Sequence, residues 1–333
     1  MIDKILNIIN PGSKDLSELS KDELLSLLIK LNRYLRCLDE NDNVMSENME
    51  VNDLVSPTKE VQMKVLEYLI QNMSKIQDKK ARAAIVYYIL LDLHMFSNGN
   101  GRTSRFMYDL ISGDLSDDNI SYYFHESSNN TKEQKNDLEK SKGIMDVYFV
   151  NKIPDELFKS QLSLLYKGVL EKYTWITVGH TEFSPPLETI IPKTVLEQLN
   201  KKEFKDLNKI LSDGYGSAFS PSGLAMLYVS SKKGQLNDWI TINDSKLSKD
   251  AALGIKGRLN FSIYRNPEMI ADWTVDDFRE IINVGNAVKY ARLKCLIDIF
   301  VEPEKYININ TGNTYYDDIL GVSKVKENYG VNK

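Results

Sequence analysis

The sequence has few cysteines, no long apolar run and no excess of basic residues. Two cysteines in 333 residues exclude a framework of disulfide bonds and favour a reducing compartment. The most apolar run, residues 83–91, is about half as long as a bilayer-spanning helix, so we expect no membrane association. The 42 lysines and arginines stand against 47 aspartates and glutamates, and this net charge of −5 argues against a nucleic-acid partner.

The remaining composition is that of a globular protein. A hydrophobic content of 42% excludes global disorder, and the length suits two domains. The first residues include Asp3 and Lys4 before a short apolar stretch, and no cleavage site of small residues follows. This start does not resemble a secretory signal peptide, so we expect a cytoplasmic protein. Export into a host cell by a route without such a signal is left open.

Hydrophobic spacing predicts a mainly helical fold. The N-terminal helices are expected over residues 19–36, 57–73, 78–94 and 101–112. Ser20 and Glu23 form a capping-box pattern at the first of these, and Pro57 suits the first position of the second. Residues 83–91 are apolar all round, so the third helix is predicted to be buried.

Short strands and further helices are predicted elsewhere. Val44-Met45 and Met49-Glu50-Val51 flank Ser46–Asn48 and predict a small β-hairpin. Residues 114–145 form a polar insertion. Later helices are expected over residues 154–173, 193–210, from Pro221 onward and over 275–300, and strands over 175–178 and 239–242. We therefore predict a first domain over residues 1–173 and a mostly helical C-terminal domain with short strands over 174–333.

One segment, His94 to Arg105, carries a pattern that predicts chemistry. A histidine ends a buried helix, a loop with two glycines and two asparagines follows, and a new helix then opens. Gly99 and Gly101 allow backbone amides to approach a ligand closely, and the helix start favours an anion. Arg102 and Arg105 lie three residues apart on one face and suit phosphate. A histidine beside this cradle predicts a general base that activates a hydroxyl.

This segment resembles the signature of the Fic family, His-x-Phe-x-(Asp/Glu)-Gly-Asn-Gly-Arg-x-x-Arg. The matching residues are His94, Phe96, Gly99, Asn100, Gly101, Arg102 and Arg105. The resemblance covers about residues 18–112 and implies a helical core with a small β-hairpin flap. It implies that the flap, with Val44, Met45, Met49, Glu50 and Val51, positions a target protein by strand addition.

The resemblance also implies roles for the matching residues. His94 would deprotonate a Ser, Thr or Tyr hydroxyl of a target protein, which then attacks the α-phosphate of ATP and takes AMP. Gly99, Asn100 and Gly101 would hold the α-phosphate. Arg102 would contact the outer phosphates and Arg105 the γ-phosphate. The implied activity is that of a protein adenylyltransferase with ATP as co-substrate and Mg²⁺ or Mn²⁺ as cofactor.

Two positions qualify this expectation. Asn98 stands where most active members carry Asp or Glu to bind magnesium, and a neutral amide offers an oxygen without a charge. Ser323 and Glu327 match the family's inhibitory pattern Ser/Thr-x-x-x-Glu-Gly/Asn, so Glu327 is a candidate restraint on the last arginine of the motif. Two alternatives therefore stay open: a degenerate fold that binds nucleotide or a partner without efficient catalysis, and a transferase that uses UTP or CDP-choline.

Overall fold

The computed structural model describes two compact units, each assembled from segments that are far apart in the sequence. The described residues are 2–9, 16–46, 50–51, 54–55, 57–117, 123, 176–177, 187–212, 221–235, 238, 259–260, 267–307 and 312–320. The first unit comprises residues 1–46, 65–150 and 294–333, and the second comprises 47–64 and 151–293. The mainly helical fold class is confirmed. The units differ from the two continuous domains expected from the sequence, because α3 (Lys59–Met73) and α13 (Val275–Val301) each supply residues to both.

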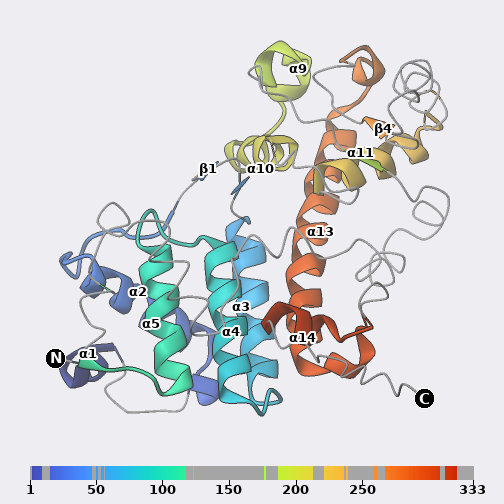
Figure 1. Ribbon diagram of the computed structural model, residues 1–333. Helices are drawn as coiled ribbons and strands as arrows, with labels where there is room; N and C mark the ends of the chain where they lie inside the picture. Colours follow the sequence, from blue (N-terminus) through green and yellow to red (C-terminus); the bar gives the residue numbers. More distant parts are fainter. Residues whose placement is uncertain are drawn as a thin grey trace, which may run out of the picture. The chain divides into compact units, whose positions relative to one another are not determined.

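The first unit is built around α4 (Lys79–Leu93), which packs against α5 (Asn100–Ser112). Helix α2 (Lys21–Leu35) packs against α5, and α1 (Ile2–Ile9), which the sequence analysis did not predict, packs against α2. Figure 1 shows α4 and α5 side by side. Every residue of α4 from Ala83 to Leu90 is buried, so the prediction of a central helix is confirmed.

Side-chain caps fix the starts of two of these helices, and the one at Ser20 was predicted. The Ser20 hydroxyl accepts from the Glu23 amide at 3.2 Å, and the Glu23 carboxylate accepts from the Ser20 amide at 2.8 Å, which completes the capping box. The Asp78 carboxylate accepts from the amide of Ala81 at 2.8 Å and caps α4. Each of these caps supplies an acceptor to a helix-start amide that has no partner within the helix.

Helix α3 begins later than predicted. Its first residue is Lys59, so Pro57 stands two positions before the helix rather than at its first turn. Thr58 is the flanking residue, since its carbonyl accepts from the amide of Gln62 at 2.9 Å. Its hydroxyl donates to Oδ1 of Asn286 at 3.2 Å, a contact that no local sequence pattern announces.

The predicted hairpin is not confirmed, and a neighbouring hairpin with a different pairing is present. Strand β1 (Glu50–Val51) pairs antiparallel with β2 (Leu54–Val55), so residues 50 and 51 pair with a later segment and not with residues 44 and 45. The predicted pairing across Ser46–Asn48 is therefore wrong, because Met45 finds its backbone partner at Phe96 instead. Residue Met49 of the predicted flap lies outside the described residues.

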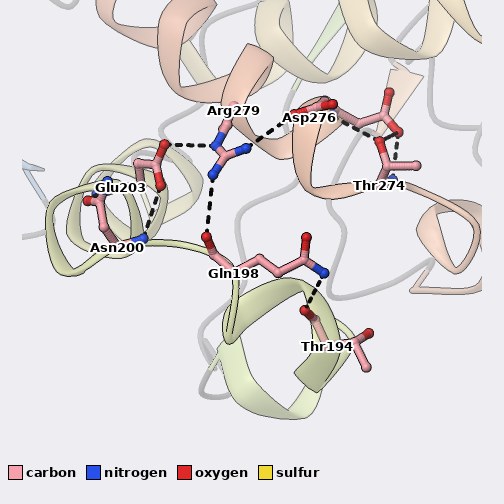
Figure 2. Close-up of polar contacts among 8 residues, drawn as sticks. Thr194, Gln198, Asn200, Glu203, Thr274, Asp276 and Arg279 are labelled. Atoms are coloured by element: carbon pink, nitrogen blue, oxygen red, sulfur yellow. Dashed lines mark hydrogen bonds and ion pairs between the residues drawn. The ribbon is translucent and has the colours of Figure 1, made fainter.

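In the second unit, one predicted helix over residues 193–210 is interrupted. The structure has α9 (Lys193–Leu196) and α10 (Lys201–Ser212). Asn200 caps α10, since its Oδ1 accepts from the amide of Glu203 at 2.9 Å and its own amide donates to the Glu203 carboxylate at 3.0 Å. Arg279 donates to that carboxylate at 2.9 Å and to the Gln198 carbonyl at 3.4 Å, as Figure 2 shows. The predicted helix is therefore interrupted because a second, separately capped helix begins after Asn200.

Other predicted elements of the second unit are confirmed. Helix α11 (Pro221–Lys232) begins at its proline, and α13 begins after Thr274, whose amide and hydroxyl both donate to the Asp277 carboxylate. Strand β3 (Ile176–Thr177) agrees with the prediction and pairs in parallel with β4 (Leu259–Asn260). The predicted elements at 154–173 and 239–242 lie outside the described residues.

Short elements complete the described chain. The 3₁₀ turns are Leu16–Glu18, Leu187–Thr189, Pro267–Ile270 and Pro303–Lys305, and the last helix is α14 (Tyr315–Leu320). Helix α14 was not predicted, because the polar tail after Pro303 lacks helical periodicity. Over the described ranges, no helix combines the length and apolarity needed to cross a bilayer.

Candidate functional site

His94 ends α4 and starts the loop that leads to α5. Its backbone is left-handed, with φ 42° and ψ 52°, and its amide donates to the Leu91 carbonyl at 3.2 Å. Left-handed geometry is uncommon for a residue with a side chain, and here it terminates the helix so that the chain can turn back. The imidazole is therefore carried on a helix end that is fixed by the buried α4.

The Asn100 side chain closes this loop. Its amide nitrogen donates to the Phe96 carbonyl at 2.7 Å, and its Oδ1 accepts from the Phe96 amide at 2.9 Å. The same nitrogen lies 3.2 and 3.4 Å from the two ring nitrogens of His94. Asn100 and Phe96 are both buried. One side chain thus joins the histidine, the middle of the loop and the start of α5.

The segment Val44–Ser46 supports the loop from behind. Met45 forms an antiparallel bridge with Phe96. The Ser97 amide donates to the Val44 carbonyl at 2.9 Å, and the Ser46 amide donates to the Met95 carbonyl at 2.8 Å. Val44, Met95 and Phe96 are buried, so this part of the predicted flap contributes to the site as a structural support.

Gly99 satisfies two demands that only glycine meets. It is the N-cap of α5 with φ 79°, which is a conformation that residues with a Cβ rarely adopt. A Cβ at this position would lie 2.9 Å from Nδ2 of Asn32 and 3.1 Å from Cδ of Arg36. A side chain at this position would therefore displace the side chains of Asn32 and Arg36 as well as strain the backbone.

Asn32 is a site residue that sequence reasoning missed. It is fully buried on α2, and its Nδ2 donates to the Asn98 carbonyl at 3.0 Å and to Oγ1 of Thr103 at 3.1 Å. Nη1 of Arg36 donates to Oδ1 of Asn32 and to the Ser97 hydroxyl. One feature of the sequence could have identified Asn32: it is a polar residue on the apolar stripe of the helix, four positions after Leu28.

The two motif arginines have different environments. Arg102 is 8% exposed, and its Nη1 donates to the Leu35 carbonyl at 3.3 Å, which ties α5 to the end of α2. Arg105 is half-buried, and its Nη1 lies 3.1 Å from the position that a Cβ on Gly101 would occupy. Gly101 therefore leaves room for the Arg105 guanidinium beside the first turn of α5. The phosphate contact of Arg102 stays a prediction that competes with its bond to Leu35.

Asn98 is a poor magnesium ligand in this geometry. Its side chain is exposed, and its Oδ1 accepts from the amide of Gly99 at 2.6 Å. Magnesium prefers anionic oxygens, and this oxygen is neutral and already hydrogen-bonded. Among the residues that the structure describes, no group of three or more His, Cys, Asp and Glu side chains could hold a metal ion. The loop itself thus does not fit the expected metal.

Burial sets the charge state of His94. Removal of the ring from water lowers the pKa of His94 below its ordinary value, because desolvation disfavours the imidazolium. The ring is therefore neutral at pH 7 and has a lone pair with which to accept a proton. The first turn of α5, a helix of 13 residues, adds amides that have no acceptor within the helix and that favour an anion.

The structure joins several predicted site residues: His94 contacts Asn100, Asn98 contacts Gly99, and Arg105 lies beside Gly101. Val44 and Met45 of the predicted flap pair with the loop through their backbones. Glu50 and Val51 of the predicted flap belong to the second unit. Ser323 and Glu327 lie outside the described residues, so the inhibitory role of Glu327 stays a prediction.

Comparison with known proteins gives one match. Residues 25–112 match the model of the Fic/DOC family, a range that runs from within α2 through α3, α4 and the loop to the end of α5. Neither the curated proteins nor the solved structures contain a match to this chain.

Proposed function

We propose, on the premise that residues 25–112 form a Fic domain, that this chain transfers AMP from ATP to a hydroxyl of a target protein. The supporting observation is the position of His94, whose ring lies 3.2 Å from the Asn100 amide nitrogen at the start of α5. A neutral base and an anion-favouring helix start are thereby held within one short loop. This is the arrangement that nucleotidyl transfer to a hydroxyl requires.

In the proposed reaction, His94 accepts the proton of a Ser, Thr or Tyr hydroxyl as its oxygen bonds to the α-phosphorus of ATP. The bond from that phosphorus to the bridging oxygen breaks, and pyrophosphate leaves. The first amides of α5 and the Arg105 guanidinium hold the phosphates and stabilise the developing charge. Asn100 keeps the imidazole beside these groups through its contacts with the ring and with Phe96.

We further propose that a divalent cation, Mg²⁺ or Mn²⁺, arrives with the nucleotide phosphates and is not held by the loop. The neutral, hydrogen-bonded oxygen of Asn98 supports this proposal. The prediction is that Asn98→Asp lowers the concentration of Mg²⁺ needed for half-maximal transfer, because a carboxylate adds the anionic ligand. A magnesium titration of both proteins measures this, and identical titration curves would contradict it.

A second function, nucleotide binding without efficient transfer, is supported by Asn98 and by the Arg102 bond to the Leu35 carbonyl. Incubation of the purified chain with labelled ATP and Mg²⁺ separates the two functions. Transfer to the chain itself or to a lysate protein, lost in His94→Ala, supports the enzyme. If neither the wild type nor His94→Ala transfers label, and Asn98→Asp does, the result supports the binding function. A parallel mass-shift screen with UTP and CDP-choline identifies a different donor.

We propose the cytoplasm as the compartment of this reaction. Cys37 is exposed, Cys295 is buried, and both are free thiols, which suits a reducing environment. The target protein is expected to carry an accessible Ser, Thr or Tyr hydroxyl.

A further inference from the structure

The second unit contains a cavity with a strongly basic lining. Its volume is about 530 Å³, which lies in the range of small-molecule sites, roughly 300–1,000 Å³. It is lined by the start of α3 and one face of α10, with the residues Thr58, Lys59, Glu60, Lys201, Lys202, Lys205, Asp206 and Lys209. Five lysines thus face two carboxylates, whereas the chain as a whole carries a net negative charge.

The basic face of α10 is fixed in place by the packing of its opposite face. Lys201, Lys205 and Lys209 repeat every four residues and so lie on one side of the helix. On the other side Ile210 is fully buried, and a Cβ on Gly285 of α13 would lie 2.7 Å from its Cγ2. This close approach packs α10 against α13 and fixes which face of α10 carries the lysines.

The start of α3 is fixed in the same way. Thr58 is 4% exposed, and its hydroxyl donates to Asn286 of α13 at 3.2 Å. Glu60 pairs with Lys64 at 2.9 Å, and Lys64 does not line the cavity. The carboxylate of Glu60 is therefore paired with a lysine that does not line the cavity. Asp206 is the carboxylate that lies among the lysines of the cavity.

Like charges at this spacing lower stability. Lysines four residues apart repel each other by a few tenths of a kcal/mol, about 0.2–0.5, in a helix. Burial and the nearby Lys289, which is only 6% exposed, lower the pKa of Lys209, so its protonated form is disfavoured. A bound anion would relieve this repulsion, because each phosphate can accept from more than one ammonium group.

We propose that this cavity binds a soluble anion that carries several phosphate groups. Lysines from two separate elements suit phosphates spread over a few ångströms, which a single carboxylate would not neutralise together. The positive end of α3, a helix of 15 residues, adds to the same potential. The cavity belongs to the second unit and the histidine loop to the first, so this site is distinct from the one proposed for transfer.

The test is calorimetric titration of the full chain with sodium tripolyphosphate and, separately, with inositol hexakisphosphate. In the double variant Lys205→Ala/Lys209→Ala we expect the affinity to fall by roughly 100-fold, about tenfold for each lost charge-assisted contact. The control is Lys79→Ala/Lys80→Ala, which removes the same charge from two exposed lysines of α4 and is expected to bind as the wild type does.

Unfolding by urea without ligand checks that the variant folds. The double variant is expected to be at least as stable as the wild type, because it removes repulsion. Equal affinities of the wild type and the double variant would overturn the proposal. An equal loss of affinity in the α4 control variant would also overturn the proposal, since that result would mean that the anion responds to the overall charge of the protein and not to this cavity. Binding to vesicles with phosphatidylinositol bisphosphate or to single-stranded RNA, without binding to either soluble anion, would overturn it as well.

Discussion

Asn32 provides the sharpest test of how the loop is held. Its Nδ2 donates to the Asn98 carbonyl and to Oγ1 of Thr103, and both the Asn32 and Thr103 side chains are almost fully buried. Asn32→Leu keeps the approximate volume but removes both donors. Each hydrogen bond contributes about 1 kcal/mol net, and a stranded buried partner costs about 1–3 kcal/mol more. We therefore expect the free energy of unfolding to fall by about 2–4 kcal/mol.

The matched control is Asn72→Leu. Asn72 is 6% exposed on α3, and its Nδ2 donates to the Tyr68 carbonyl at 2.8 Å. That carbonyl lies within the helix, so we expect a loss of about 1 kcal/mol and no effect on the loop. Urea unfolding followed by circular dichroism gives both stabilities, and label transfer from ATP is then measured where both variants are folded.

The two variants should separate in the transfer assay. Asn32→Leu is expected to lower transfer by at least about tenfold in folded protein, since a small misplacement of reacting groups is costly. Asn72→Leu is expected to leave transfer per folded molecule unchanged. If Asn32→Leu unfolds within about 0.5 kcal/mol of the wild type, or if both variants lose transfer equally, the reasoning is refuted.

Four further predictions concern His94, Gly99 and Gly285. Because burial lowers the pKa of His94, transfer should be constant above neutrality and fall as acid protonates the ring, as a pH–rate profile would show. The same shift means that the unfolded chain binds a proton at the His94 ring more readily than the folded chain does. The contribution of His94 to stability is therefore present above its ordinary pKa and is lost as pH falls through its lowered pKa in the folded chain. Urea unfolding at several pH values measures this change in the free energy of unfolding. Gly99→Ala should destabilise the protein more than Gly113→Ala does, because both glycines have positive φ but only a Cβ at position 99 would meet neighbouring atoms. Gly113→Ala is expected to lower the free energy of unfolding by about 1–2 kcal/mol. Equal losses for the two variants in urea unfolding would contradict the argument from contacts. Gly285→Ala should destabilise by about 1–3 kcal/mol through overpacking on Ile210. In a chain that already carries Ile210→Ala, the same substitution should cost less, as a double-mutant cycle of thermal unfolding would show.

Much of the first unit was predictable because its signals are local. The capping box at Ser20, the apolar run of α4 and the glycines around α5 each depend on neighbours within a few residues. The same local rules failed at Asn200, where a second capping box interrupts the predicted helix. They failed there because helical periodicity continues across the break and outweighed the capping signal.

The pairing of short strands could not be predicted for a different reason. Val44 and Met45 read as half of a local hairpin, but their backbone bonds go to the histidine loop about fifty residues later. A two- or three-residue strand has too little pattern to select its partner. In the folded chain, the partner of residues 44–46 is decided by the burial of Val44 and by the backbone groups of residues 95–97, which accept from and donate to this segment.

The sequence by itself determined that this protein is mainly helical, and it predicted that residues 94–105 carry its chemistry, because helix periodicity, caps and the spacing of histidine, glycine and arginine are properties of adjacent residues. Only the tertiary structure decided which groups hold that segment. It assigned Asn32 to the loop, turned Arg102 toward Leu35 and engaged the Asn98 oxygen with a backbone amide. These choices depend on which buried polar groups meet across helices, and each such group must find a partner wherever the fold supplies one.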